Sequence, residues 1–291
     1  MSTSLTGSAG AYRPTPLEQQ RRGVRARRSR RSTLTALAST LAFAAVAYLV
    51  VTNAPGWPRV QASFFDVDVA REYLPDILRG LWLNVRVLAV AAVLTVLLAL
   101  VLAVVRTLRG PVWLPLRLVA TVYVDFFRGV PLIVLLYLVG FGVPALRFTE
   151  GRVSAVALGT AAIVLTYSAY VSEVFRAGID TVHPSQRLGA RSLGLSYAQS
   201  MRLVVLPQAV RRVTPPLLND FVAMQKDVGL ISLLGAVDAV RAAQIGALES
   251  FNFTPYVVAA LLFVALSVPT ARLADWVTAR AARREQAGGV L

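Results

Sequence analysis

The chain has 291 residues, of which 56% are hydrophobic and 15% are charged. Soluble domains carry about 25% charged residues, so this chain has too little polar surface to cover a water-soluble globule, and a membrane is its natural solvent. The formal net charge of +15 comes from arginines that lie in patches between long apolar runs, which disfavours nucleic-acid binding as the explanation for the charge.

Three residue types exclude whole classes of chemistry. The chain has no cysteine, so it has no disulfide, no thiolate metal site and no cysteine nucleophile, and its single histidine, His183, excludes a multi-histidine metal site. A phosphate-binding loop needs Gly-Lys followed by Ser or Thr, whereas the only lysine, Lys226, lies between Gln225 and Asp227. We therefore expect no catalytic residue, no metal and no cofactor on this chain, and any ATP hydrolysis takes place on a partner chain.

The N-terminal region combines a basic segment with an apolar one. Residues 1–33 are polar and rich in arginine, and such a run of like charge predicts a disordered basic tail. The apolar run over 34–52 is longer than the core of a usual signal peptide, and Asn53-Ala54-Pro55 is a poor cleavage site. The pattern predicts an additional N-terminal membrane helix over 34–52.

Five further apolar stretches predict membrane spans, and in chain order they cover 80–105, 113–140, 153–172, 203–236 and 254–276. A spanning helix needs about 20 apolar residues, and four of these stretches fit that length. The stretch 203–236 contains prolines and charged residues, so we expect a bent backbone whose polar face is turned towards protein or a water-filled path. With the N-terminal helix, the count is six spans.

The distribution of arginine between the connections predicts the orientation. The connections with the strongest basic clusters are 1–33, 106–112, 173–202 and 277–291. The connections with most of the loop acids, among them Asp238, are 52–79, 141–152 and 237–253. Because basic loops stay in the cytoplasm, both termini are expected there. The expected domains are a transmembrane domain over 80–277, with a cytoplasmic loop over 173–207, and a basic cytoplasmic tail over 278–291.

The cytoplasmic loop over 173–207 contains the signals of short helices. Pro184 and Ser185 suit the start of a helix, and Gly194 suits its end, because glycine accepts a left-handed backbone there. Ser196 then suits the start of a second helix, which leads into the next span.

The first of these helices carries two adjacent small residues. Gly189 and Ala190 would let the surface of another protein approach closely, so the loop is a candidate docking site. The alternative is an ordinary helix on the membrane surface.

Several polar or charged residues lie at membrane depth, where a charge costs about 2.5–3.5 kcal/mol and normally faces the protein interior. The candidates for a substrate path are Asn219, Asp220, Lys226, Asp227 and Arg128. The alternative is that they pair with each other or with neighbours, for instance Asp125 with Arg128, Asp220 with Lys226, or Arg128 with Glu173.

Five ordered motifs resemble ABC-transporter permeases of the polar amino-acid uptake group. They are Phe-Arg-Gly-Val-Pro-Leu ending at Leu132, Glu-x-x-Arg-x-Gly-Ile from Glu173 to Ile179, Leu-Pro-Gln-Ala from Leu206 to Ala209, Pro-Pro-Leu-x-Asn from Pro215 to Asn219, and Lys226-Asp227. The resemblance runs from about Gly80 to Trp276. The chain departs from the group at Leu188, where the group has glutamate, at Gly189, where it has alanine, and at Val228-Gly229, where it has Thr-Ser.

The resemblance implies an all-α membrane protein of about six transmembrane helices with a cytoplasmic coupling-helix loop, as in type I importer permeases. It implies a bacterial inner-membrane location, a polar amino acid as substrate, a separate ATPase that uses the ATP, an extracytoplasmic solute-binding protein and a second permease subunit in a homo- or heterodimer. It implies no nucleic-acid partner. The residues that it assigns to ATPase coupling are Glu173, Arg176, Gly178, Arg187, Leu188, Gly189, Ala190, Arg191, Gly194, Leu206 and Pro207.

Two other functions stay open. The same machinery could import another small polar solute, such as an opine or an organosulfur compound. A gradient-driven carrier or a membrane scaffold is the alternative from another class, but carriers often show paired inverted halves, and the chain has no convincing internal repeat.

Overall fold

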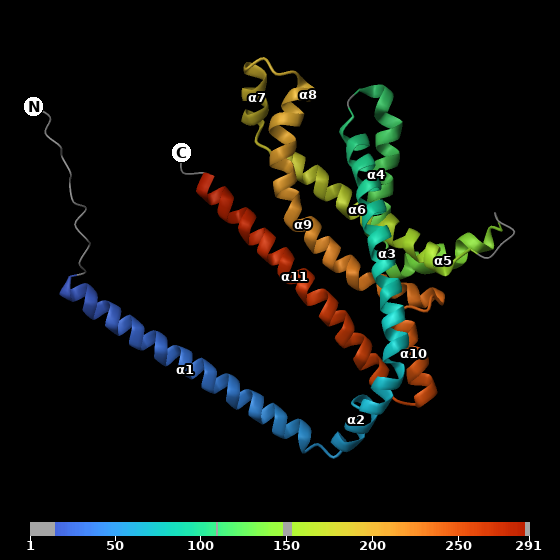
Figure 1. The fold of residues 1–291 in the computed structure, drawn as a ribbon. Coiled ribbons are helices and arrows are strands. Elements are labelled where there is room, and N and C mark those ends of the chain that lie inside the picture. Colours follow the sequence, from blue (N-terminus) through green and yellow to red (C-terminus); the bar gives the residue numbers. More distant parts are fainter. Residues whose placement is uncertain (1–14, 109, 148–152, 289–291) are drawn as a thin grey trace, which may run out of the picture. The chain divides into compact units, whose positions relative to one another are not determined.

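The computed structural model describes residues 15–108, 110–147 and 153–288, and every regular element in these ranges is a helix (Figure 1). The chain forms two compact units, Met1–Gln61 and Ala62–Leu291. The second unit therefore contains all the predicted spans except the N-terminal one.

The first unit contains helix α1 (Pro16–Thr52), and helix α2 (Trp57–Phe64) crosses the boundary between the units. Within α1, Ser32–Thr52 is long and apolar enough to span a membrane, which agrees with the prediction for 34–52. The prediction of disorder is wrong for 16–33, whose backbone is helical, and residues 1–14 lie outside the described residues. Arginine, glutamine and alanine are good helix formers, and adding a turn to an existing helix avoids the cost of nucleation.

The second unit is built from long helices joined by short ones. In chain order they are α3 (Val67–Thr107), the 3₁₀ turn η1 (Pro111–Trp113), α4 (Leu114–Gly129), α5 (Leu132–Ala145), α6 (Ala155–Asp180), α7 (Pro184–Ser192), α8 (Tyr197–Ser200), the π-helical turn η2 (Met201–Val205), α9 (Leu206–Asp227), the 3₁₀ segment η3 (Val228–Leu234), α10 (Ala239–Ser250) and α11 (Thr254–Gly288).

Four helical stretches of the described chain can cross a membrane alone, namely Ser32–Thr52, Trp57–Thr107, Ala155–Asp180 and Thr254–Arg280. Two bent pairs raise the number to six if each pair is one span. The predicted count of six therefore depends on counting broken helices as spans.

The stretch 113–140 is not the single helix that its length predicts. It breaks between α4 and α5, whose axes differ by 110°. Pro131 causes the break, because its ring disfavours helical backbone at the preceding residue, and Val130 is extended with φ −93° and ψ 127°. The bend expected in 203–236 is present as well, but it lies mainly after η3, where Gly235 has φ +88°, while Pro215 and Pro216 lie inside α9.

Helix α6 is the centre of the packing, because it contacts α3, α4, α5 and α9. Its buried face carries Ile163 and Tyr167, which pack in one cluster with Val87 of α3, Met224 of α9 and Ile231 of η3. Large apolar side chains elsewhere in the second unit are exposed, above all on α11, whose most apolar window is only 11% buried. Such an outer surface suits lipid rather than water.

A polar contact, the clasp, fastens α3 to the break before α10, and it consists of Gly80, Asn84 and Asp238. The Asn84 side-chain nitrogen Nδ2 donates to Asp238 Oδ2 (2.9 Å) and to the Val228 carbonyl oxygen (3.2 Å), and the Ala239 amide donates to Asn84 Oδ1 (3.1 Å). A Cβ atom at Gly80 would overlap the backbone of Asp238. Asp238 lies in the connection where the sequence places it, but it is fully buried and caps α10.

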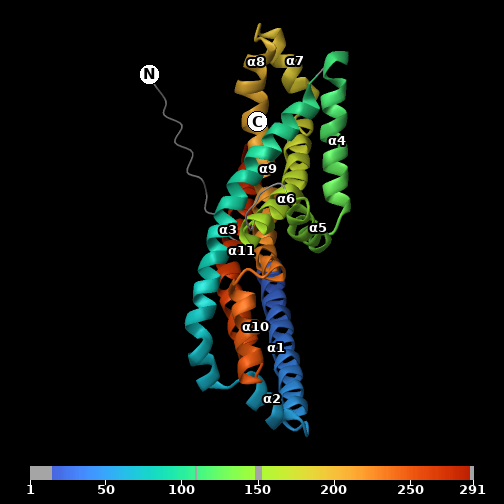
Figure 2. The same ribbon diagram turned by 90° about the vertical axis from the view of Figure 1, so that its right-hand side faces the viewer.

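The two ends of the second unit are formed by different segments of the chain. Helices α7 and α8, the connection from α3 to α4, and the C-terminal end of α11 lie towards one end, whereas α10 lies towards the other (Figure 2). These three segments are the parts of the second unit that the arginine distribution places together on the cytoplasmic side.

Candidate functional site

The base of the predicted coupling loop is an ion-pair network on the last turns of α6. Glu173 Oε2 accepts a hydrogen bond from Arg106 of α3 at 2.6 Å, and Glu173 Oε1 accepts from Arg176. Arg176 also contacts Asp180 at 3.3 Å. Because Arg106 and Glu173 are mostly buried, their pairing fixes α3 against α6 where the loop begins.

Gly178 allows a close approach in the same region. A Cβ atom there would overlap the side chain of Val213 on α9. Of the three residues that the sequence motif groups together, Glu173 and Gly178 hold α6 against α3 and α9, whereas Arg176 pairs within α6.

Two arginines cap the C-terminal end of α6. Arg187 Nη2 donates to the Ile179 carbonyl oxygen at 2.7 Å, and Arg212 of α9 donates to the Thr181 carbonyl oxygen. These carbonyls have no partner within the helix, and the negative end of a helix favours a cation. Arg187 is therefore turned towards its own chain, where it fastens α7 to the end of α6.

Helix α7 begins and ends as the sequence predicts, with one change at the start. His183 rather than Pro184 or Ser185 is the N-cap, and its ring nitrogen Nδ1 accepts from the Ser185 amide. At the end, Gly194 has φ +81°, and the amide of Leu195 bonds the Ala190 carbonyl. The Gly194 amide also donates a hydrogen bond to the Arg191 carbonyl. These two hydrogen bonds around a left-handed glycine form a Schellman motif.

Helix α8 also begins where predicted. Ser196 and Gln199 form a reciprocal capping box at its start, in which each side chain accepts from the other residue's backbone amide.

The tip of the loop exposes apolar side chains, and we define the loop tip as Leu188, Leu193 and Tyr197. Leu188 is 67% exposed and Leu193 is 83% exposed. Gly189 is open, because a Cβ atom there would meet nothing within 4 Å, but Ala190 is buried against its own chain. The expectation that Ala190 lets a partner approach closely is therefore wrong, and the exposed side chains here are the leucines.

A π-helical turn joins the loop to α9. The Leu206 amide bonds the Met201 carbonyl, five residues back, and Pro207, which follows, has no amide hydrogen to donate. Val205 is buried there beside Val182. Leu206 and Pro207 thus shape the connection, and both are also exposed on its outer surface.

Two of the predicted substrate-path residues lie near one tyrosine. Tyr167 of α6 donates its hydroxyl to Asp227 Oδ2 at 2.8 Å. Asp220 lies about two helical turns earlier on α9, and its Oδ2 atom is buried without a hydrogen-bond partner among the described residues. A buried carboxylate oxygen with no partner is costly, and it is free to accept a hydrogen bond from a cation.

Arg128 has a different partner from the one expected. Its guanidinium carbon lies 5.7 Å from the ring centroid of Tyr170, and the Tyr170 hydroxyl donates to the Arg128 carbonyl oxygen. Glu173 pairs with Arg106 and Arg176 instead. Within the described chain, the alternative pairs Asp125–Arg128 and Asp220–Lys226 do not form.

The remaining candidates form no side-chain hydrogen bond or ion pair, within the described chain, with Asp220 and Asp227, which we call the acidic pair. Lys226 is exposed and lines an apolar hollow of about 320 Å³ with Val222 and Phe263. Asn219 is exposed. Gln225, which precedes Lys226, is buried. Its Oε1 atom accepts a hydrogen bond from the hydroxyl of Thr270 on α11 at 2.9 Å.

Sequence reasoning missed four residues of these contacts. Tyr167 and Tyr170 were interpreted only as part of an apolar span. Their spacing of three nevertheless places both on one face of α6, with ring centroids 6.5 Å apart. Asn84 lies within the predicted span 80–105 and was a polar signal of the kind that marks interhelical hydrogen bonds. Asp238 gave no such signal, because it follows an apolar stretch as loop acids do.

The comparisons with known proteins agree with this picture. The profile of the family described as "binding-protein-dependent transport system inner membrane component" matches residues 114–283. The arginine transport system permease protein ArtQ of Bacillus subtilis is 30% identical over 204 residues, which are 69% of this chain and 90% of that protein. The putative glutamine transport system permease protein GlnP of Rickettsia prowazekii is 35% identical, over 65% of this chain and 86% of that protein.

Solved structures show the same relationship. A crystal structure of an amino acid ABC transporter with histidines has a TM-score of 0.68 and 31% identity, and the match covers 74% of this chain and 98% of the other. An inward-facing MetNI methionine ABC transporter shares the fold, with a TM-score of 0.54 and 19% identity over 70% of this chain and 95% of the other. The chain therefore belongs to the family of inner-membrane components of binding-protein-dependent transport systems, as a multi-pass ABC-transporter permease and not the ATPase.

Proposed function

We propose that the chain is the permease subunit of an ATP-driven importer of polar amino acids. It receives its substrate from an extracytoplasmic solute-binding protein and pairs with a second permease subunit. The observation that carries the coupling part of this proposal is the loop tip, because Leu188 and Leu193 are large apolar side chains left exposed on a loop whose base is packed. Relatives named as arginine and glutamine permeases support the substrate class.

The loop tip docks on the separate ATPase. When ATP closes the ATPase subunits, their movement displaces α7. Arg187 passes the movement to the end of α6, and the π-helical turn before Leu206 passes it to α9. Two packings of the spans that are close in energy then alternate, and ATP and substrate bias the balance between them.

Docking relies on apolar contact more than on charge. The acidic residue of the group's coupling helix is replaced by Leu188, and Arg187 is engaged with Ile179. Of the loop's arginines, Arg191 is exposed and remains available to the partner. Buried apolar anchors dominate many protein interfaces, so the loss of one acidic contact does not abolish docking.

The acidic pair Asp220 and Asp227 recognises the ammonium group that every amino acid carries. Asp220 offers a carboxylate oxygen without a partner, and Tyr167 orients Asp227. Arg128, beside Tyr170, offers a cation for the substrate carboxylate. Bonds to charged groups are worth about 1.5–3 kcal/mol, so each contact contributes measurably to affinity.

The decisive experiment is uptake in proteoliposomes that contain the permease with its ATPase and binding protein. We expect labelled amino acid to be transported across the membrane only when ATP is present on the side where the ATPase is bound. Uptake that survives without the ATPase, or that an ionophore abolishes while ATP is present, would refute the proposal. A binding protein that takes an opine or an organosulfur compound and no amino acid would refute the substrate class alone.

The substrate contact has its own test in Asp220→Asn. We expect the KM for uptake to rise about tenfold, because one bond to a charged group is lost, while ATPase binding stays unchanged. Asp76→Asn is the matched control, since Asp76 is an exposed acid of α3. An unchanged KM for Asp220→Asn would remove this residue from the path.

The orientation is tested by labelling. The chain has no cysteine, so a single Ser185→Cys substitution places one thiol on an exposed residue of α7. With both termini cytoplasmic, an impermeant maleimide added outside the cell leaves this thiol unlabelled, and it reacts only after the membrane is permeabilised. Labelling in intact cells contradicts the orientation.

A further inference from the structure

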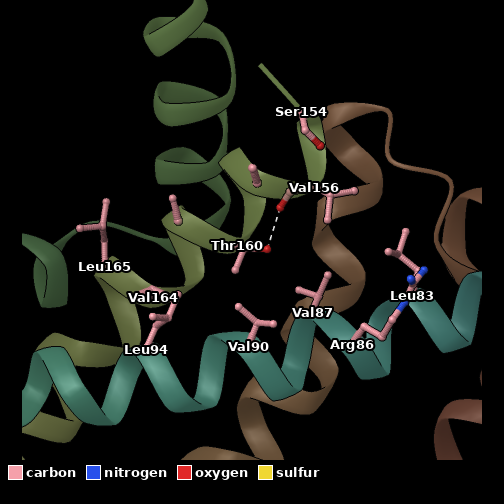
Figure 3. Close-up of a pocket in the computed structure, with 12 residues that line it drawn as sticks. Leu83, Arg86, Val87, Val90, Leu94, Ser154, Val156, Thr160, Val164 and Leu165 are labelled. Carbon is pink, nitrogen blue, oxygen red and sulfur yellow. Dashed lines mark hydrogen bonds between the residues drawn. The ribbon is translucent and has the colours of Figure 1, made fainter. Parts of the chain in front are cut away.

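An open groove of about 690 Å³ lies between α3 and α6, and its lining includes no residue of the acidic pair or of the loop (Figure 3). Its α3 side is formed by Leu83, Arg86, Val87, Val90 and Leu94. Its α6 side is formed by Ser154, Val156, Ala157, Thr160, Ala161, Val164 and Leu165. Both helices are candidate membrane spans, so the groove opens where lipid is the solvent.

The groove has one polar end and an apolar remainder. Arg86 and Ser154 lie towards one end, whereas Leu94 and Leu165 lie towards the other (Figure 3). The hydroxyl of Thr160 in the middle donates to the Val156 carbonyl of its own helix at 2.7 Å. The body of the groove therefore offers hydrocarbon contacts and no free donor.

Arg86 has no ion-pair partner among the described residues. It also borders a neighbouring hollow that contains Asp76 and Glu249, but neither carboxylate is within 4.0 Å, and Asp76 pairs with Arg79. An exposed guanidinium at the mouth of an apolar groove is complementary to an anion that carries hydrocarbon.

The position of Arg86 along α3 gives its depth in the membrane. Arg86 and Arg106 are 20 positions apart on this helix, which at 1.5 Å per residue is about 30 Å. That distance equals the thickness of a bilayer's hydrocarbon core, and the intervening residues contain no charge. Arg86 therefore lies at one membrane surface, at the level of the lipid phosphates.

We propose that the groove is a binding site for one glycerophospholipid, whose phosphate lies on the Arg86 guanidinium and whose acyl chain lies along the apolar body. The lengths agree. From Arg86 to Leu94 the groove follows α3 for about 12 Å, and the hydrocarbon of one leaflet is about 15 Å thick. The site belongs to the leaflet at the α10 end of the unit, the outer leaflet if both termini are cytoplasmic.

A polar amino acid does not fit this groove. A zwitterion here would have Arg86 for its carboxylate, but its ammonium would be desolvated without an acceptor, at a cost of several kcal/mol. The phospholipid site is thus separate from the proposed substrate contacts, and it depends only on the chain's place in the membrane.

Native mass spectrometry of the assembled transporter tests the site. The transporter is reconstituted in a defined mixture of phosphatidylethanolamine and phosphatidylglycerol and then released into mild detergent. We expect the wild-type permease to retain one phospholipid mass per copy. Arg86→Gln should lower the retained fraction about fivefold, the effect of one arginine at a charged membrane surface.

Ala161→Trp blocks the groove without touching Arg86, because Ala161 is an exposed residue of its wall. This variant should lose the lipid entirely. Arg79→Gln is the matched control, since Arg79 lies on the same helix outside the groove, and it should retain the lipid at the wild-type level. Equal retention by wild type, Arg86→Gln and Ala161→Trp would overturn the proposal, as would retention of free inorganic phosphate alone.

A crosslinker identifies the occupant directly. With photoreactive p-benzoylphenylalanine in place of Val90, which is 52% exposed in the groove, illumination in the membrane should add the mass of one phospholipid to the permease. A crosslink to the neighbouring permease subunit would instead show that a second subunit covers the groove, and the lipid site would be refuted.

Discussion

The clasp and the loop tip distribute polar and apolar groups in opposite ways. In the clasp, Asn84 is 1% exposed and Asp238 is fully buried, and their hydrogen bonds satisfy backbone groups where a helix is broken. In the loop tip, caps at the ends of α7 and α8 hydrogen-bond backbone groups locally, and the leucines are exposed.

The difference reflects what surrounds each region. A broken helix that is buried in protein has no water to hydrogen-bond its open amides and carbonyls, so side chains from α3 replace water. The loop tip lies outside the spans, where water satisfies polar groups and exposed apolar area remains available for a partner. Substitutions in the clasp should therefore alter stability, and substitutions in the loop tip should alter coupling.

The largest effect is expected for Gly80→Ala. The added methyl group overlaps the backbone at Asp238, which cannot move without opening the clasp, so the free energy of unfolding should fall by about 3 kcal/mol. The thermal unfolding midpoint in detergent measures the change. Gly142→Ala is the control, because a Cβ there meets nothing within 4 Å, and alanine should slightly stabilise α5. Equal midpoints for the two variants would contradict the close approach.

Glu173→Gln should have the next largest effect, because it leaves Arg106 and Arg176 without their shared carboxylate. Both Arg106 and Glu173 are mostly shielded from solvent, and we expect a loss of about 2 kcal/mol in the free energy of unfolding. Asp76→Asn removes an exposed pair with Arg79 and should change stability by less than about 0.5 kcal/mol. If the two variants lost the same stability, the network at the base of the loop would be no more than a surface feature.

Leu193→Ser should separate coupling from stability. Leu193 is almost fully exposed, so its removal should leave the unfolding midpoint unchanged. The affinity of the ATPase for the permease should fall about tenfold, the effect of a single apolar anchor worth about 1.4 kcal/mol. Binding of the ATPase to permease in nanodiscs measures this. A large drop in the unfolding midpoint would show that Leu193 is part of the fold rather than of the docking surface.

The smallest effect is expected for Leu188→Glu, which restores the acidic residue of the group's coupling helix. Since Leu188 is exposed, stability should change by less than about 0.5 kcal/mol. ATP-driven uptake should be preserved or increased, because glutamate is the residue of the resembled group at this position and Leu193 keeps the apolar contact with the ATPase. A measured loss of uptake would mean that this transporter docks its ATPase through contacts of its own, in which the leucine is required.

Much of the architecture could be predicted because it depends on local chemistry. The apolar runs located the membrane helices, the arginines grouped the connections now seen towards one end, and the cap residues Pro184, Gly194 and Ser196 located α7 and α8. Each of these signals acts over a few residues, within one helix or one turn. The signal for the break at Pro131 was equally local. It was missed because the prediction of one span over 113–140 relied on the length of the apolar stretch.

The tertiary structure decided which groups meet. Nothing in the spacing of Arg106 and Glu173, or of Asn84 and Asp238, shows that they are partners, because they are 67 and 154 positions apart. It also decided which way side chains on one short helix point, so that Ala190 is buried and Leu188 is exposed. The sequence by itself determined the membrane helices and the residues at which the short helices begin and end, since hydropathy and capping are local. Pairing and exposure depend on how the helices pack, and only the folded chain decides them.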